Sequence, residues 1–209
     1  MADIKRVQKL TDYKWLNLYD VEYSTLDGAT RHWIFASRKT PVPAGRPLVP
    51  DAVVVIPLLK VGRQRKLVTI KEFRIPIGDY EYGFPAGLYD KQESAEEVAR
   101  RELKEETGLD VTKVLYVGPP NVSSAGLSDE TAVYVIVECA GSVSTDGNEG
   151  SEEITVNVLD LAGVKDLRQS KFKISAKAFP FLLMFEALNK IDWPKHLHSS
   201  PNLSESDKI

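Results

Sequence analysis

The sequence has 209 residues, a formal net charge of −3 at pH 7 and a hydrophobic fraction of 43%. This length suits one domain with a small additional region, and the charge excludes the basic field with which proteins attract nucleic acid polymers. No apolar stretch is long enough to cross a bilayer. Cys139 is the sole cysteine, and the first ten residues lack the apolar core of a signal peptide. Together these features predict a protein of the reducing cytoplasm.

The first fifty residues predict an antiparallel β hairpin. Residues 15–23 mix aromatic, β-branched and polar side chains as strands do, and residues 31–35 form the expected return strand. Asp27-Gly28 marks a tight turn between them, and the Pro/Gly-rich segment 40–47 is a linker. Since a single hairpin is marginally stable, region 1–50 is expected to pack on the main domain or on another subunit.

The main domain is expected to span residues 51–192, followed by a flexible tail at 193–209. Its pattern of apolar residues and turn signals predicts several strands, two main helices and two long loops. The strands are 53–59, 66–74, 114–117, 131–137 and 154–159, the helices 95–107 and 180–190, and the loops 119–130 and 142–153. Strands and helices in this mixed order predict an α/β fold with helices over a mixed sheet.

The helix at 95–107 has clear signals at both ends. Ser94 followed by Glu97 forms a capping box, in which each side chain accepts a hydrogen bond from the other residue's backbone N–H. Gly108 is placed to end the helix, because glycine adopts a left-handed conformation at little cost. Val98 and Leu103 contribute to an apolar flank that can face a core.

Three glutamates share one ridge of this predicted helix. Glu106 is four residues and Glu105 three residues beyond Glu102, so their Cβ atoms lie about 5–6 Å apart. Exposed carboxylates at this spacing repel each other by about 0.2–0.5 kcal/mol per pair. Mg²⁺, in contrast, prefers oxygen ligands. The ridge therefore indicates a divalent-cation site, although a solvated charged helix would explain these residues if they stood alone.

The wider pattern around the ridge is much more specific. Gly87 is followed by five residues and Glu93, and then by seven residues and Arg101-Glu102-Leu103-x-Glu105-Glu106-x-Gly108-Leu109. This pattern resembles the Nudix box at every fixed position. The resemblance implies an α/β/α Nudix sandwich with a mixed sheet, here preceded by the N-terminal hairpin. It also implies hydrolysis of a diphosphate bond with Mg²⁺, or Mn²⁺, as cofactor.

The same resemblance implies a role for individual residues. One main-chain carbonyl and three carboxylates would bind the metal: Ala86, Glu102, Glu105 and Glu106. Arg101 would orient the glutamates and Glu93 would be a structural or accessory acid. Arg101 and Glu105 are also counted among the catalytic residues.

Two segments near the box, 71–76 and 84–88, resemble the ADP-ribose/ADP-sugar pyrophosphatase branch of this family. In that branch Arg74 would contact a phosphate or stack on a base. The surroundings of Trp15 and Trp33 resemble those of dimeric enzymes in which tryptophans from different subunits sandwich adenine, a contact worth about 1–3 kcal/mol per stacked base. The expected partners are a nucleoside diphosphate sugar and a second copy of the chain, without a nucleic acid polymer or a membrane.

Two positions depart from this branch. Ala125 stands where a proline is usual, and Gly83 stands where an acid often precedes the Phe-Pro-Ala-Gly turn. ADP-ribose is the leading substrate because of the resemblance. The two departures leave another nucleoside diphosphate sugar as an alternative. A Nudix hydrolase of a dinucleoside polyphosphate and a non-catalytic nucleotide sensor are further alternatives.

A general base is expected from the acidic loop before the strand at 154–159. Glu152 aligns best with the base of the resembled branch, and Glu149, Glu153 and Glu130 are the other candidates. Glu130 is also assigned to substrate binding.

Overall fold

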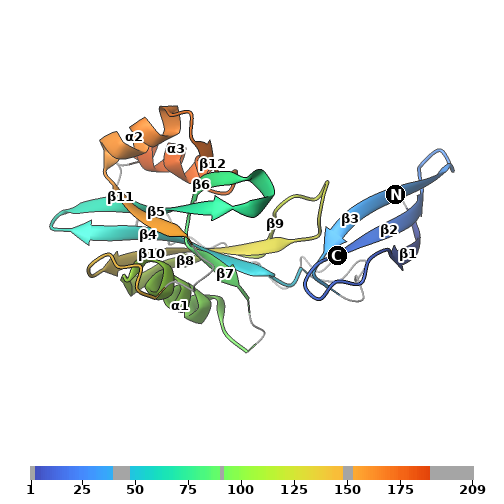
Figure 1. The fold of residues 1–209 in the computed structure, drawn as a ribbon, viewed down its shortest axis with the longest axis horizontal. Helices are drawn as coiled ribbons and strands as arrows, with labels where there is room; N and C mark the ends of the chain where they lie inside the picture. The colour runs from blue at the N-terminus through green and yellow to red at the C-terminus, as the bar shows by residue number, and fades with distance from the viewer. Residues whose placement is uncertain (1–2, 40–47, 90–91, 148–152, 189–209) are drawn as a thin grey trace, which may run out of the picture. The chain divides into compact units, whose positions relative to one another are not determined.

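A computed structural model describes residues 3–39, 48–89, 92–147 and 153–188. The chain forms two compact units, the first comprising Met1–Ala52 and Pro119–Val133 and the second comprising Val53–Gly118 and Tyr134–Ile209 (Figure 1). The predicted linker 40–47 and the predicted tail 193–209 lie outside the described residues.

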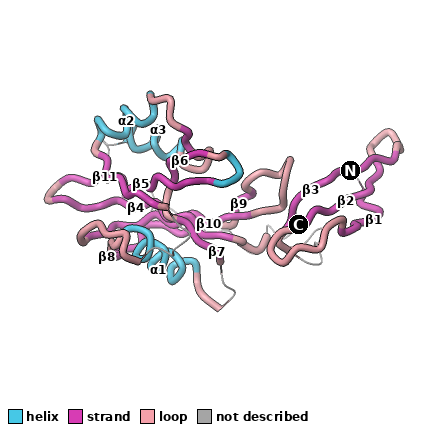
Figure 2. The backbone as a smooth tube through the Cα atoms, viewed as in Figure 1, coloured by secondary structure: helices cyan, strands magenta, loops and turns pink. Residues whose placement is uncertain are grey.

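The first unit contains a three-stranded antiparallel sheet, ordered β1 (Asp3–Lys9), β2 (Asn17–Ser24) and β3 (Thr30–Ser37) (Figure 2). The predicted hairpin corresponds to β2 and β3, and Gly28 adopts a left-handed φ of 83° in the turn between them. The sequence analysis missed β1 because its charged sequence offers few apolar residues from which to recognise a strand.

A second segment of the first unit is hydrogen-bonded to β3. The carbonyl of Leu127 accepts a bond of 2.8 Å from the amide of Ala36, and the Ser37 hydroxyl donates to Asp129 at 2.9 Å. Residues 119–133, which were expected to be a loop and the start of a strand, therefore form part of the same unit as the N-terminal sheet.

The remaining strands form a mixed sheet of the α/β class, as predicted. Six strands follow the order β12-β6-β5-β4-β10-β8, while β11 pairs with β5, β7 with β4 and β9 with β10. β12 pairs with β6 in parallel fashion, and β5 pairs in antiparallel fashion with β4, β6 and β11. The bounds are β4 Ala52–Val61, β5 Gln64–Arg74, β6 Asp79–Gly83, β7 Ala86–Leu88, β8 Asp110–Val117, β9 Asn121–Val122, β10 Thr131–Ala140, β11 Ile154–Leu159 and β12 Lys173–Ile174.

Among the described residues of the second unit, three α-helices pack on the sheet, with α1 on one face and α2 and α3 on the other (Figure 1). The helix predicted at 95–107 is α1 (Ala95–Thr107), and that predicted at 180–190 is α3 (Phe179–Leu188). The helix α2 (Leu161–Gln169) was not predicted, although Asp160 caps it by accepting a bond of 2.9 Å from the amide of Gly163. A short 3₁₀ helix, Ile75–Ile77, follows β5.

The helix α1 contributes side chains to the core of the second unit. Fully buried side chains come from β4, β5, α1 and α3, including Ile56, Leu67, Leu103 and Leu182. Burial of one such side chain contributes about 1.5–3 kcal/mol. Leu103 lies between Glu102 and the other two ridge glutamates, so the packing that buries it also fixes the ridge against the sheet. No helix of the described residues is long and apolar enough to span a membrane.

The C-terminal end of α1 gives a test of the fold. Gly108 has a φ of +74°, and a Cβ atom there would lie 2.7 Å from the backbone nitrogen of Ser144. We expect Gly108→Ala to destabilise the protein by more than the about 1–2 kcal/mol of left-handed strain, because the clash adds to it. Gly126→Ala is the matched control, since Gly126 has open space around it. Urea denaturation of the three proteins checks this, and equal midpoints would contradict it.

Candidate active site

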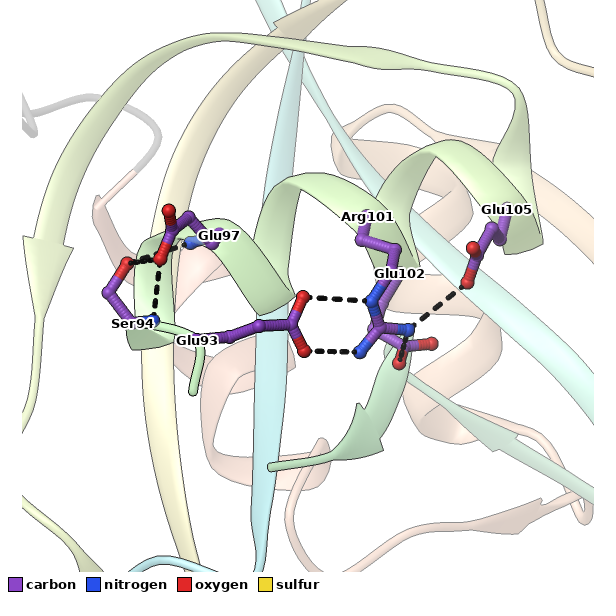
Figure 3. A network of polar contacts seen from close by, with 6 residues as sticks. All are labelled: Glu93, Ser94, Glu97, Arg101, Glu102 and Glu105. Carbon is purple, nitrogen blue, oxygen red and sulfur yellow. Dashed lines mark hydrogen bonds and ion pairs between the residues drawn. The ribbon is translucent and has the colours of Figure 1, made fainter. Parts of the chain in front are cut away.

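The helix α1 begins with the capping box that the sequence predicted (Figure 3). The Ser94 hydroxyl accepts a bond of 3.2 Å from the amide of Glu97, whose carboxylate accepts one of 2.7 Å from the amide of Ser94. The bonds that the Ser94 amide and hydroxyl donate to this carboxylate favour its charged form and lower the pKa of Glu97. The start of the helix, and with it the angular position of the ridge, is therefore fixed about two turns before the first ridge residue.

The ridge glutamates differ sharply in their exposure to solvent. Glu102 and Glu106 are 9% and 5% exposed, whereas the side chain of Glu105 is 49% exposed. Glu102 and Glu106 lie on the buried flank of the helix with Val98 and Leu103. A carboxylate that loses water must be compensated by hydrogen bonds or opposite charge. Burial of two carboxylates one turn apart is therefore an unusual and costly feature of this helix.

Arg101 supplies opposite charge to this group (Figure 3). Its guanidinium donates two bonds of 3.2 Å to Glu93, one of 2.5 Å to Glu102 and one of 3.2 Å to Glu105. The hydrogen bonds to Glu93, and then the charge of Glu102, raise the pKa of Arg101 above its ordinary value. One arginine thus connects Glu93, which precedes the helix, with two glutamates of the ridge.

The strand β7 approaches the ridge closely at Gly87. A Cβ atom added to Gly87 would lie 1.7 Å from Oε1 and 1.9 Å from Cδ of Glu102. The carboxylate of Glu102 therefore occupies the place that any other side chain at residue 87 would fill. Ala86, whose carbonyl was predicted to bind the metal, is the neighbouring residue and the first of β7.

The ridge carries oxygen donors that are not gathered into a preformed metal cage. Among the described residues, no three Asp, Glu, His or Cys side chains already converge on one point as a metal cage would. Arg101 stands between Glu102 and Glu105, so cation binding by these glutamates competes with their contacts to the arginine. The donors nevertheless fit in kind, because three carboxylates on one ridge are the oxygen ligands that Mg²⁺ prefers.

Arg74, a predicted substrate contact, ends β5. Its guanidinium donates a bond of 2.8 Å to Glu72 and lies 3.6 Å from a carboxylate oxygen of Glu81 on β6. Glu72 and Glu81 are directly opposite each other across β5 and β6. Arg74 therefore screens two like charges that would otherwise repel each other, and its side chain remains 45% exposed.

Two of the candidates for the general base, Glu149 and Glu152, lie outside the described residues. Glu153, also a candidate, accepts a hydrogen bond from the hydroxyl of Tyr80, and this bond raises the pKa of the tyrosine. Sequence reasoning missed the Tyr80 contact. The two residues meet because β6 and β11 both pair with β5, and these pairings cannot be read from the sequence.

The other predicted substrate contacts belong to the first unit. Trp15 lies between β1 and β2 and is 67% exposed, with the ammonium of Lys14 4.4 Å from the ring centre. Trp33 lies on β3 opposite Val21 and is 49% exposed. Glu130 lies just before β10, where its carbonyl accepts a bond of 2.9 Å from the amide of Ser123. Both tryptophans are thus well exposed to solvent.

Comparison with known proteins agrees with this geometry. The NUDIX domain matches residues 49–179 of the chain. An ADP-ribose pyrophosphatase of Saccharomyces cerevisiae is 30% identical over 140 residues, which are 66% of this chain and 58% of the relative. An ADP-sugar pyrophosphatase of Mus musculus is 35% identical over 133 residues, which are 63% of this chain and 59% of the relative. In these comparisons the chain spans less than two thirds of the length of either relative.

A solved structure supports the fold. The crystal structure of an ADP compounds hydrolase superposes with a TM-score of 0.65 and 22% identity, covering 90% of this chain and 95% of that chain. At this identity the likeness concerns the fold alone, and it confirms the predicted Nudix architecture. Because the domain match covers more than half of its residues, the chain belongs to the Nudix family.

Proposed function

We propose that the protein hydrolyses the diphosphate bond of a nucleoside diphosphate sugar, with ADP-ribose as the leading substrate. The products are a nucleoside monophosphate and a sugar phosphate. The observation that carries this proposal is the ridge of α1, on which Glu102 and Glu106 are both buried. Glu102 lies against Gly87 and forms an ion pair with Arg101. The names of the yeast and mouse relatives support the choice of substrate class.

The ridge is the proposed binding site for Mg²⁺. Glu102, Glu105 and Glu106 would hold the ion, together with the carbonyl of Ala86. The ion, when bound, neutralises charge on the phosphoryl oxygens and lowers the pKa of a bound water. The contribution of the protein is to keep these donors on one face of a capped helix that is packed against the sheet.

Arg101 has two proposed tasks. It holds Glu102 and Glu105 in place through its own anchor to Glu93, which lies ahead of the helix. It also screens the repulsion between the glutamates, because its guanidinium is always charged. All three ridge glutamates are retained, a feature that favours catalysis over the alternative of a non-catalytic sensor.

The proposed substrate contacts are Trp15 and Trp33 for the base, Arg74 for the base or the phosphates, and Glu130. Exposed indole faces are good platforms for adenine. Large apolar side chains left in water usually mark a contact surface, and Trp15, Trp33 and Ile34 are all well exposed. We therefore also propose that two copies of the chain associate through the first unit.

A panel of substrates tests the proposed function. ADP-ribose, other nucleotide sugars and dinucleoside polyphosphates are assayed with and without Mg²⁺, and ADP-ribose is expected to give the highest kcat/KM in the presence of the ion. Glu106→Gln should remove most of this turnover, because the amide keeps the shape of the side chain but loses its charge. Glu96→Gln, on the solvent side of α1, is the matched control and should keep the wild-type rate.

Thermal unfolding separates damage to the fold from damage to the site in this experiment. The control substitution should change stability by less than about 0.5 kcal/mol, as surface substitutions do. A folded Glu106→Gln protein that works at the wild-type rate in limiting Mg²⁺ is incompatible with a metal-binding ridge.

Glu152 is the proposed general base. Glu152→Gln should lower kcat by about 10²–10⁴-fold with little change in substrate binding, because a base acts in the chemical step. Glu153→Gln is the neighbouring control, and a smaller loss is expected because Glu153 already accepts a bond from Tyr80. If Glu152→Gln loses less than about tenfold while Glu149→Gln, Glu153→Gln or Glu130→Gln loses more, the role moves to that residue.

Replacement of the tryptophans tests the proposed base platform. Trp15→Ala and Trp33→Ala should each raise KM by about 5- to 150-fold, given about 1–3 kcal/mol per stacked base, while Mg²⁺ dependence is kept. Tyr13→Ala removes another aromatic side chain of the first unit, one that is 72% exposed, and should leave KM unchanged.

Light scattering tests the proposed association and should give twice the chain mass of 23.3 kDa. A monomer would refute the proposed association of two copies. An unchanged KM in both tryptophan variants would refute the proposed base platform.

A further inference from the structure

The connection between β10 and β11 lies against the C-terminal turn of α1. The amide of Ser144 donates a bond of 2.9 Å to the carbonyl of Thr107, the last residue of the helix. The last four carbonyls of a helix have no partner within it, so this bond satisfies one of them. The amide of Gly108 bonds to the carbonyl of Lys104 at 2.9 Å and satisfies another. The end of α1 is thus closed partly by a segment distant in sequence.

Two glycines allow this close approach. A Cβ atom on Gly108 would lie 2.7 Å from the nitrogen of Ser144. A Cβ atom on Gly147 would lie 2.8 Å from the carbonyl oxygen and 3.1 Å from the Cα atom of Glu105. These neighbours are backbone atoms, which cannot rotate away as the tip of a side chain can. We call the contacts of Gly108, Ser144 and Gly147 with the helix the α1 clamp.

Gly147 differs from Gly108 in one informative respect. Gly108 has a left-handed φ, so its backbone conformation alone favours glycine. Gly147 does not have a positive φ, and other residues could adopt its backbone conformation. The reason for glycine at residue 147 is therefore the lack of space against Glu105. Glycine at residue 147 is thus explained by its contact with the helix and not by the backbone conformation of a turn.

The turn held by the clamp carries Glu105 and Glu106. Helix ends fray, and a carboxylate on a fraying turn moves relative to its neighbours. Mg²⁺ demands near-ideal octahedral geometry at about 2.0–2.1 Å, so it is sensitive to displacements of a few tenths of an ångström. We propose that Gly147 is a positioning residue, which fixes the Glu105–Glu106 turn for cation binding through the α1 clamp. This inference builds on the proposed function.

Hydrogen exchange tests the clamp itself, without any metal. Gly147→Ala should speed exchange of the amides in residues 103–108, because either the helix turn or the connection has to move to admit the methyl group. Gly126→Ala is the matched control, since Gly126 also lacks a positive φ but has no atom within 4 Å of its added Cβ. Unchanged exchange in Gly147→Ala would overturn the clamp.

Binding of Mn²⁺, followed by electron paramagnetic resonance, then tests positioning. Gly147→Ala should bind the ion about tenfold or more weakly, as is typical when residues that support metal ligands are changed. The Mg²⁺ concentration for half-maximal turnover should rise by the same factor, with kcat at saturating Mg²⁺ near wild type. Gly126→Ala should match wild type in both measurements.

The possible outcomes separate this inference from the proposed function. Faster exchange with wild-type metal affinity would overturn the positioning role of Gly147. A wild-type protein that hydrolyses no nucleotide sugar would overturn the proposed function, while the exchange and Mn²⁺ measurements would still decide the role of Gly147.

Discussion

The interaction on which the candidate site depends is the contact of one guanidinium with three carboxylates. Arg101 joins Glu93, Glu102 and Glu105, and Glu102 is almost buried. Without this positive charge, the glutamates would face mutual repulsion and loss of water together, and the helix that carries them would be weakened. The arginine allows the protein to keep a dense group of oxygen donors on a helix that also packs into the core.

The surrounding structure brings other parts of the chain close to this group. On strand β7, the position of a Cβ atom at Gly87 is occupied by the carboxylate of Glu102. The connection after β10 also lies close to the helix, where a Cβ atom on Gly147 would be 2.8 Å from the carbonyl oxygen of Glu105. The capping box fixes the first turn of α1, and Leu103 anchors its middle. The ridge is therefore supported at its start, its centre and its end by three different kinds of contact.

Much of this site could be predicted from local sequence signals. The cap at Ser94, the end at Gly108 and the spacing of the glutamates are all local, and α1 has the predicted bounds. The strand β1 and the tight contact of Gly147 could not be predicted. The segment of β1 is rich in charged residues and forms a strand because it pairs with β2. The contact of Gly147 cannot be read from the sequence, because residues 105 and 147 are far apart in the chain and meet only in the folded structure. The Tyr80–Glu153 bond was missed for the same reason.

The central claim is that the ridge of α1 binds a divalent cation in exchange for contacts with Arg101. Anomalous scattering from crystals grown with Mn²⁺ tests this most directly, because it locates the ion without assumptions about activity. The account predicts an anomalous peak within about 2.0–2.3 Å of carboxylate oxygens of the ridge, with the bond between Arg101 and Glu102 lengthened or broken. A Mn²⁺-dependent, active protein whose crystals show the ion elsewhere, with that bond intact, would contradict it.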